Sequence, residues 1–436
     1  MAISGRTALL AALGTLVVGA LPGWHGILAV GLPLLAAVVL DLALAAPVRP
    51  LRFHRDGATS VRVGEPAQVH LTVTNPSGRR LRADVRDAWP PSSWQQPREA
   101  YSAARHRLTV PAGERRRLTT TLRPTRRGSR SAARVTVRSH GPLGLAARQG
   151  NHEVPWSVRV LPAFSSRKHL PGKLARLREL DGRTTVLTRG EGTEFDSLRE
   201  YVPGDEVRSI DWRATARQSS VAVRTWRPER DRHLVLVLDS GRTSAGRVGD
   251  VPRLDAAMDA ALLLTALASH AGDRVDVLAY DRRVRLSVRG RTGSELLPAV
   301  VTALSSLESA LIETDAAGMV SAALAGAPRR SLIVLFTGLD SSPVESGLLP
   351  VLPRLTRRHH VMVAAVGDPR IAEMARAGGS VAGVYEAAAA AQYEVERRRT
   401  TALLRQQGVT VVEAAPEGLA PAVADAYLAL KAAGRL

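Results

Sequence analysis

The chain has 436 residues, and its 60 Lys and Arg outnumber its 40 Asp and Glu, which gives a formal charge of +20 at pH 7. It contains no cysteine, which excludes disulfides, thiolate metal sites and cysteine nucleophiles. The positive charge lies almost wholly within residues 47–233, but no basic patch interleaved with aromatics and no nucleic-acid motif accompanies it, so a nucleic-acid partner is not expected. The length predicts two or three domains, since a domain commonly holds about 100–200 residues.

Two apolar stretches, residues 7–21 and 27–46, open the chain. The second is long enough to cross roughly 30 Å of hydrocarbon as a helix, and the first is shorter but has Trp24 as an interfacial anchor. Arg6 precedes the pair, and three arginines follow it at Arg49, Arg52 and Arg55. Residues 1–47 are therefore predicted to form a hairpin of two transmembrane helices with both ends in the cytoplasm, because cytoplasmic flanks are enriched in arginine.

A signal peptide is the alternative for residues 7–21, with Arg6 as its charged start and Val18-Gly19-Ala20 as a weak cleavage site. The stretch 27–46 would then anchor the chain alone. Both interpretations place the chain in the cell's inner (plasma) membrane with its soluble domains in the cytoplasm.

Residues 48–160 alternate apolar and polar side chains with a period of two, as at 61–63, 69–73 and 134–138. Short alternating strands separated by turns rich in Gly and Pro predict a small antiparallel β-sandwich of immunoglobulin-like type. The arginines fall on the solvent-facing positions of these strands. Because the sandwich directly follows the predicted anchor, its positive face is also expected to attract anionic lipids of the inner leaflet.

Residues 161–233 are predicted to be a connector that carries an acidic segment, residues 190–212. Seven carboxylates and only two arginines lie between residues 190 and 211. Ser197 and Glu200 have the spacing of a capping box, which predicts a short helix from Leu198, and residues 222–226 are predicted to be a strand. The carboxylates have two interpretations: helix caps and ion pairs with nearby arginines, or a docking surface or cation site.

From residue 234 onward, apolar runs alternate with helical patterns. The runs 234–238, 275–280, 332–336 and 361–366 are nearly continuous, as is typical of strands buried on both faces. Residues 234–436 are therefore predicted to be an α/β domain with a doubly wound, mostly parallel sheet. Ligands of such sheets bind beyond the carboxyl ends of the strands, where Asp239 and Thr337 are expected.

The motifs at residues 190–212, 226–230 and 234–239 closely resemble the bacterial domain-of-unknown-function 58 family. The resemblance extends to the amino-terminal helices and to the β-rich segment that ends near residue 145. It implies a von Willebrand factor A-like domain at the carboxyl end. It also implies a MoxR-type AAA+ ATPase as partner, since genes of that class neighbour those of the family.

The resemblance further implies a Mg²⁺ site that opens with Asp-x-Ser-x-Ser and adds a Thr and an Asp from later loops. The opening here is Asp239-Ser240-Gly241-Arg242-Thr243, so Gly241 lacks the first hydroxyl and Arg242 adds a cation. The ligands expected for Mg²⁺, which prefers hard oxygens, are Asp239, Thr243, Thr314 and Asp340. In the alternative interpretation, Asp239 caps the following loop and pairs with an arginine.

These features predict an adaptor that binds proteins, not an enzyme, because no nucleophile elbow, phosphate-binding loop or metal-binding histidine spacing occurs. The adaptor would work with a MoxR-type ATPase in the assembly or maturation of an unknown client protein. The alternative is a metal-dependent hydrolase that uses Asp205, Asp211 and Asp239. The residues expected to bind the partner are Glu194, Asp196, Arg199, Glu200, Asp205, Arg208, Asp211, Trp212 and Arg217.

Overall fold

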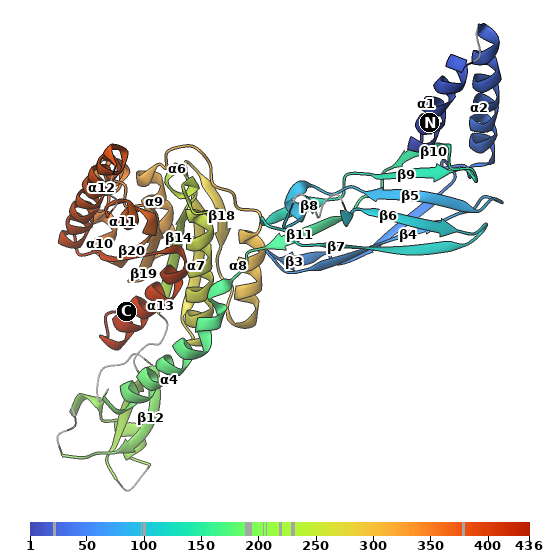
Figure 1. The fold of residues 1–436 in the computed structure, drawn as a ribbon. Helices are drawn as coiled ribbons and strands as arrows, with labels where there is room; N and C mark the ends of the chain where they lie inside the picture. Colours follow the sequence, from blue (N-terminus) through green and yellow to red (C-terminus); the bar gives the residue numbers. More distant parts are fainter. Residues whose placement is uncertain are drawn as a thin grey trace. The chain divides into compact units, whose positions relative to one another are not determined.

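The computed structural model describes residues 1–20, 23–96, 98, 102–187, 194–203, 205, 207–217, 220–227, 232–376 and 380–436. The chain forms two compact units, Met1–Ala163 and Phe164–Leu436, here called the β-unit and the α/β unit (Figure 1). The predicted connector, residues 161–233, contributes helix α4 (Leu170–Leu187) and a hairpin, and apart from its first residues it belongs to the α/β unit.

The β-unit begins with strand β1 (Ala2–Ile3) and the helices α1 (Gly5–Ala20) and α2 (Trp24–Leu44). At a rise of about 1.5 Å per residue, the 21 residues of α2 span about 31 Å, which matches the thickness of a bilayer's hydrocarbon core. The 16 residues of α1 span only about 24 Å. Among the described residues, only α2 is long and apolar enough to cross a membrane. The prediction of two membrane-spanning helices is therefore wrong for the first of them.

The rest of the β-unit is built from mostly antiparallel strands. One sheet has the order β1-β10-β9-β5-β6, a second β2-β4-β7 and a third β3-β11-β8. Alternate residues of β4 are buried, and its Leu71 and Val73 share a core with Val85 and Val137 of the first sheet. The period-two pattern thus correctly predicted antiparallel strands with one buried face. The strands are β2 (Arg52–Gly57), β3 (Ser60–Arg62), β4 (Ala67–Thr74), β5 (Leu81–Asp87), β6 (Arg105–Val110), β7 (Arg115–Leu122), β8 (Gly128–Ser131), β9 (Val135–His140), β10 (Ala146–His152) and β11 (Ser157–Leu161).

Asp41 ties the helix pair to the strands of the β-unit. It lies near the end of α2, is 0% exposed, and accepts hydrogen bonds from the backbone N–H groups of Leu143 (2.7 Å), Leu145 (2.7 Å) and Ala146 (2.9 Å). The approach is close, since a Cβ at Gly141 would lie 2.1 Å from Asp41 Oδ1. Asp41, the charged residue that interrupts the apolar stretch, therefore holds α2 against the strands of the β-unit.

The α/β unit contains a sheet of order β18-β17-β14-β19-β20-β21, in which β14 lies parallel to both of its neighbours and β18 is the antiparallel edge. The prediction of a mostly parallel α/β sheet is confirmed. The strands are β14 (His233–Asp239), β17 (Arg274–Tyr280), β18 (Val284–Val288), β19 (Leu332–Phe336), β20 (His360–Val366) and β21 (Thr410–Ala414). The helices are α6 (Arg242–Ala245), α7 (Arg253–His270), α8 (Leu296–Leu304), α9 (Ala316–Gly326), α10 (Pro353–Thr356), α11 (Pro369–Met374), α12 (Val381–Gln406) and α13 (Pro416–Ala432).

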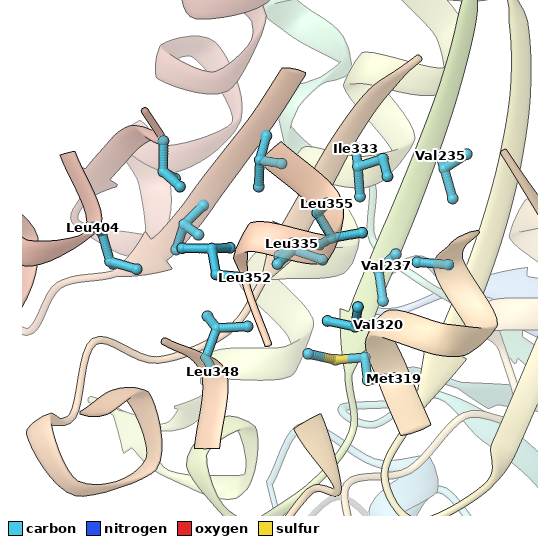
Figure 2. Close-up of a cluster of buried hydrophobic side chains, with 14 of the residues drawn as sticks. Val235, Val237, Met319, Val320, Ile333, Leu335, Leu348, Leu352, Leu355 and Leu404 are labelled. Atoms are coloured by element: carbon cyan, nitrogen blue, oxygen red, sulfur yellow. The ribbon is translucent and has the colours of Figure 1, made fainter. Parts of the chain in front are cut away.

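Helices cover both faces of this sheet. Val235 and Val237 of β14 pack with Met319 and Val320 of α9 in one buried cluster (Figure 2), which also reaches Leu404 of α12. Because side chains alternate along a strand, the intervening leucines of β14 face the other side, where α7 packs against α13 and β14. Burial on both faces explains the nearly continuous apolar runs of the sequence.

The acidic segment is part of an antiparallel hairpin of β12 (Glu194–Glu200) and β13 (Ala222–Arg227). The helix predicted from Leu198 is therefore wrong, because pairing with β13 holds Ser197 and Glu200 in an extended strand. The strand predicted at 222–226 is confirmed. Between the strands lie a 3₁₀ turn (Val207–Ser209) and helix α5 (Trp212–Thr215). Residues 190–193, 204 and 206 of the segment lie outside the described residues.

Candidate functional site

Asp239 ends β14 at the switch point of the sheet. After β14 the chain builds β17 and β18 on one side, and it then returns to build β19, β20 and β21 on the other. Sheets of this kind bind ligands beyond the carboxyl ends of the strands at this point. Asp239 is only 3% exposed. Among the described residues its hydrogen-bond donors are Gly241 N (2.8 Å), Thr243 Oγ1 (2.9 Å), Thr314 Oγ1 (2.5 Å) and Thr337 Oγ1 (2.7 Å).

The donors come from three segments near the strand ends. Gly241 follows β14 and Thr243 lies in α6, Thr314 lies two residues before α9, and Thr337 directly follows β19. The structure thus brings together Asp239, Thr243 and Thr314, which the sequence analysis predicted to be ligands of one metal site. Thr337 was expected at the strand end but was not included among the ligands. Its position one residue beyond a buried strand was the signal for it.

Gly241 is the position where the sequence departs from Asp-x-Ser-x-Ser, and the packing explains the departure. A Cβ at Gly241 would lie 2.1 Å from Thr314 Oγ1 and 2.8 Å from the carbonyl oxygen of Ile312. No side chain fits there without displacing this loop. The hydroxyl of Thr314 therefore takes the space that a serine side chain at position 241 would need.

Asp340 lies beside this site but is not a partner of Asp239. Its Oδ2 is 3.4 Å from Nη1 of Arg253, and its Oδ1 accepts a hydrogen bond from the hydroxyl of Tyr393 (3.3 Å). Gly338 lies between Asp340 and Thr243. A Cβ built on Gly338 would be 2.9 Å from Asp340 Oδ2 and 3.3 Å from Thr243 Cβ. Arg253 and Tyr393 are site neighbours that the sequence did not indicate, because they come from α7 and α12.

The donor set around Asp239 fits a small, hard cation. A carboxylate and threonine hydroxyls supply the oxygen ligands that Mg²⁺ prefers. The positive charge of Arg242 does not exclude a bound cation, because its guanidinium pairs with Glu313 (2.8 Å) at the surface. Asp239 does cap the following loop through Gly241 N, but no arginine pairs with it among the described residues. In the described parts of the chain, no group of His, Asp and Glu side chains alone could hold a metal.

Two of the acidic residues that were expected to bind a partner, Asp205 and Asp211, form ion pairs with arginines of their own hairpin. Asp205 accepts a hydrogen bond from Nη2 of Arg199 (2.5 Å). Asp211 accepts one from Nε of Arg224 (2.7 Å) and caps α5 through the N–H groups of Arg213 and Ala214. The N–H of Ala214 and the Arg224 guanidinium lower the pKa of Asp211. Caps and ion pairs therefore account for both carboxylates.

The other residues expected at the partner surface lie on the same hairpin. Glu194, Asp196 and Glu200 are in β12, Arg208 is in the 3₁₀ turn, and Arg217 follows α5. Trp212 is 66% exposed. Apolar neighbours in this hairpin are also exposed, which sequence reasoning missed because it concentrated on the charges. Together with Trp212 we call them the hairpin surface: Leu198, Val202, Val207, Trp212 and Val221.

The hydrolase alternative requires Asp205, Asp211 and Asp239 to share one centre. Asp205 and Asp211 accept hydrogen bonds from arginines of the hairpin. Asp239 instead accepts them from threonines at the carboxyl end of β14. Among the described residues no hydrogen bond joins Asp211 to Asp239. The contacts of these carboxylates therefore give no support to a shared catalytic centre.

Comparison with known proteins places the chain in a family. Residues 197–412 match the family described as Protein of unknown function DUF58. Uncharacterized proteins of Mycobacterium bovis and Mycobacterium tuberculosis are each 26% identical over 219 residues, which cover 50% of this chain and 68% of theirs. Uncharacterized protein YeaD of Bacillus subtilis is 25% identical over 113 residues, 26% of this chain and 28% of its own.

Among solved structures, the CARDB domain of the PF1109 protein from Pyrococcus furiosus is similar to 25% of this chain. The match covers 86% of that domain, with 18% identity and a TM-score of 0.19. The β-glucosidase from Listeria innocua matches 25% of this chain over 16% of its own length, with 14% identity and a TM-score of 0.16. The expected family is thus confirmed by the sequence comparisons, and residues 197–412 of the chain belong to the DUF58 family of proteins of unknown function.

Proposed function

We propose that this chain is a membrane-anchored protein-interaction module whose soluble units lie in the cytoplasm, beneath the inner (plasma) membrane. Helix α2 has the length and mean hydropathy (2.5) of a membrane span. The arginines that follow it in the sequence favour the cytoplasmic side for its end. We further propose that the β-unit is an immunoglobulin-like sandwich that carries the anchor, and that it contacts anionic lipids.

The convergence of oxygen donors on Asp239 carries the proposal. Asp239, Thr243, Thr314 and Thr337 meet at the switch point of a sheet whose order and antiparallel edge suit a von Willebrand factor A-like domain. These residues would hold Mg²⁺, with Asp340 next to them. When bound, the cation would supply a positive centre that attracts a carboxylate of a partner protein. The chain's own part is to preassemble the oxygens in a buried, rigid arrangement.

The hairpin surface is the second part of the proposed recognition face. Exposed tryptophan is typical of the residues that dominate the energy of protein interfaces, and the same hairpin carries four smaller apolar side chains that are also exposed. The same hairpin carries the ion pairs Arg199–Asp205 and Arg224–Asp211, and Asp211 directly precedes Trp212 in the sequence. We propose a MoxR-type AAA+ ATPase as the partner, acting with this chain on a client protein. The family resemblance supports this choice of partner class.

The test is the affinity of the full chain, in detergent micelles, for a purified MoxR-type ATPase encoded in the same genome. We expect Trp212→Ala to weaken binding at least ten-fold, because losses of this size mark central interface residues. The matched control is Val395→Ala, which removes an apolar side chain that is 59% exposed on α12. It should leave the affinity unchanged.

The cation is tested in the same titration with Mg²⁺ or with EDTA. Wild-type binding should be stronger in Mg²⁺, and Asp239→Asn should remove the difference, because the amide carries no charge for the cation. Wild-type protein that fails to bind the ATPase would reject the partner class. Binding that ignores both EDTA and Trp212→Ala would reject the recognition face.

A further inference from the structure

A cavity of about 470 Å³ lies where the β-unit meets the end of α2. It is lined by residues 47–49, which begin three residues after the end of α2, and by residues 148–152 of β10. Figure 1 shows β10 below the two helices, and Asp41 joins α2 to the start of this strand. No acidic residue lines the cavity, whereas Arg49, Arg148 and His152 do.

The arginines at this end of α2 also hold its last carbonyl groups. Nε of Arg148 donates to the carbonyl oxygen of Leu42 (2.9 Å), and Nη1 of Arg79 donates to that of Ala43. Positive groups at a helix carboxyl end complement its dipole. Because the span of α2 is about the thickness of the hydrocarbon core, its last turn lies at the level of the lipid head groups. Arg148 and Arg49 are therefore held at that level too.

The side chains that line the cavity retain unused hydrogen-bonding capacity. Within the described part of the chain, Arg148 forms no side-chain hydrogen bond other than that of Nε to Leu42, and Arg49 is exposed. The Nε2 atom of His152 is buried, so this nitrogen does not face a ligand in the cavity and the two arginines are its polar contacts. A guanidinium fork can bind a phosphate through two parallel N–H donors. Two arginines around one cavity, with no acidic residue among the described residues that line it, thus match the chemistry of a phosphate group.

We infer that this cavity binds the phosphate of an anionic phospholipid and so fixes the β-unit against the inner leaflet. The inference rests on the proposed anchoring by α2. Position decides between a lipid and a soluble phosphate, because the cavity begins within three residues of the last residue of α2, Leu44. Basic pockets beside membrane helices are a common way to bind lipid head groups.

The experiment measures phosphatidylglycerol binding to the full chain in detergent micelles, with phosphatidylcholine and inorganic phosphate as comparison ligands. Arg49→Gln and Arg148→Gln should each weaken phosphatidylglycerol binding roughly five- to ten-fold, since an arginine near an anionic surface contributes on that order. Arg107→Gln is the matched control, because it removes the same charge from β6, where the side chain is 89% exposed. It should bind like wild type, and millimolar inorganic phosphate should not compete.

Equal binding by Arg49→Gln and Arg107→Gln would overturn the inference, and Arg49 is exposed, so its loss should not disturb folding. Displacement of the lipid by inorganic phosphate would also overturn it, in favour of a soluble ligand. Alkaline carbonate extraction of membranes separates this result from the anchoring proposal. Release of the wild-type chain by carbonate would reject the anchor itself, whereas retention with no effect of Arg49→Gln would reject only the lipid site.

Discussion

At the scale of single residues, the packing around Asp239 depends on the absence of a side chain at Gly241. We expect Gly241→Ser, which restores the serine of Asp-x-Ser-x-Ser, to lower stability by about 1–3 kcal/mol, the usual cost of overpacking. The reason is that its Cβ would lie 2.8 Å from the backbone oxygen of Ile312. Thermal unfolding of the full chain in micelles measures this as a lower apparent melting temperature.

Gly246→Ala is the control for this prediction, because the nearest atom to its new Cβ would be 3.4 Å away, an ordinary contact. It should melt close to the wild type. If Gly241→Ser melts there as well, Thr314 and the Ile312 backbone move aside easily, and the Asp239 site is less rigid than its contacts indicate.

Asp281 makes the stability of the α/β unit depend on pH. Its side chain is 1% exposed and accepts hydrogen bonds from Arg282 N and from Nε of Arg285, each at 2.5 Å. Burial by itself raises the pKa of Asp281, but these hydrogen bonds outweigh it and lower the pKa below its usual value. A lowered carboxyl pKa stabilises the fold above the unfolded value of about 4. This stability is lost as the pH falls from about 4 through the lowered pKa.

We therefore expect the difference in melting temperature between wild type and Asp281→Asn to be largest near neutral pH and to shrink below about pH 4. Melting curves between pH 3 and pH 7 measure it. Asp250→Asn, at an exposed turn, serves as the control for the loss of one charge. A difference that stays constant down to pH 3 would contradict the assignment.

At the scale of elements, Asp41 determines how the helix pair is held to the strands. Asp41→Ala would leave the N–H groups of Leu143, Leu145 and Ala146 without their acceptor, at a cost of roughly 1–3 kcal/mol for each group left unsatisfied. We expect faster hydrogen exchange of these amides, measured by mass spectrometry of peptides spanning 141–147. Asp56→Ala removes a partly exposed carboxylate of β2 and should leave their exchange unchanged.

Elements whose residues are buried by their immediate neighbours were predicted well. The run 332–336 is β19 in full, and 234–238 differs from β14 by one residue at each end, because strands covered on both faces need apolar side chains throughout. The capping-box prediction at Ser197 failed because the partner strand β13 follows more than twenty residues later. A local pattern does not report such pairing. The apolar stretch 7–21 was already shorter than the roughly 20 residues of a membrane span, and the expectation that Trp24 would make up the difference was wrong.

The candidate site was predictable in part for a similar reason. Asp239 could be located because the end of a buried strand is visible in the sequence. The choice between Thr337 and Asp340 could not be made, because it depends on which way the loop after β19 turns its side chains. Arg253 and Tyr393 come from helices elsewhere in the chain, and only the assembled fold places them beside Asp340.

At the scale of the whole molecule, the two units divide the proposed tasks. The β-unit holds the apolar helices and the cavity with Arg49 and Arg148, so the features directed at a membrane belong to it. The α/β unit holds the Asp239 site and the hairpin surface, which are the features proposed to bind proteins. The sequence indicated this division, because its hydrophobic pattern changes from alternating apolar and polar residues to continuous apolar runs. It did not reveal that the hairpin surface would be apolar.

Strand β1 is made long before its partner exists. Ala2 pairs with Ala147 of β10, and Asp41 lies 102 residues ahead of Leu143, whose amide it accepts. During translation the helix pair therefore emerges from the ribosome with its carboxylate still lacking these amide donors. The helix pair can reach its final position only after β9 and β10 have been synthesised and folded. Completion of the β-unit thus becomes the step that fixes the helix pair in place.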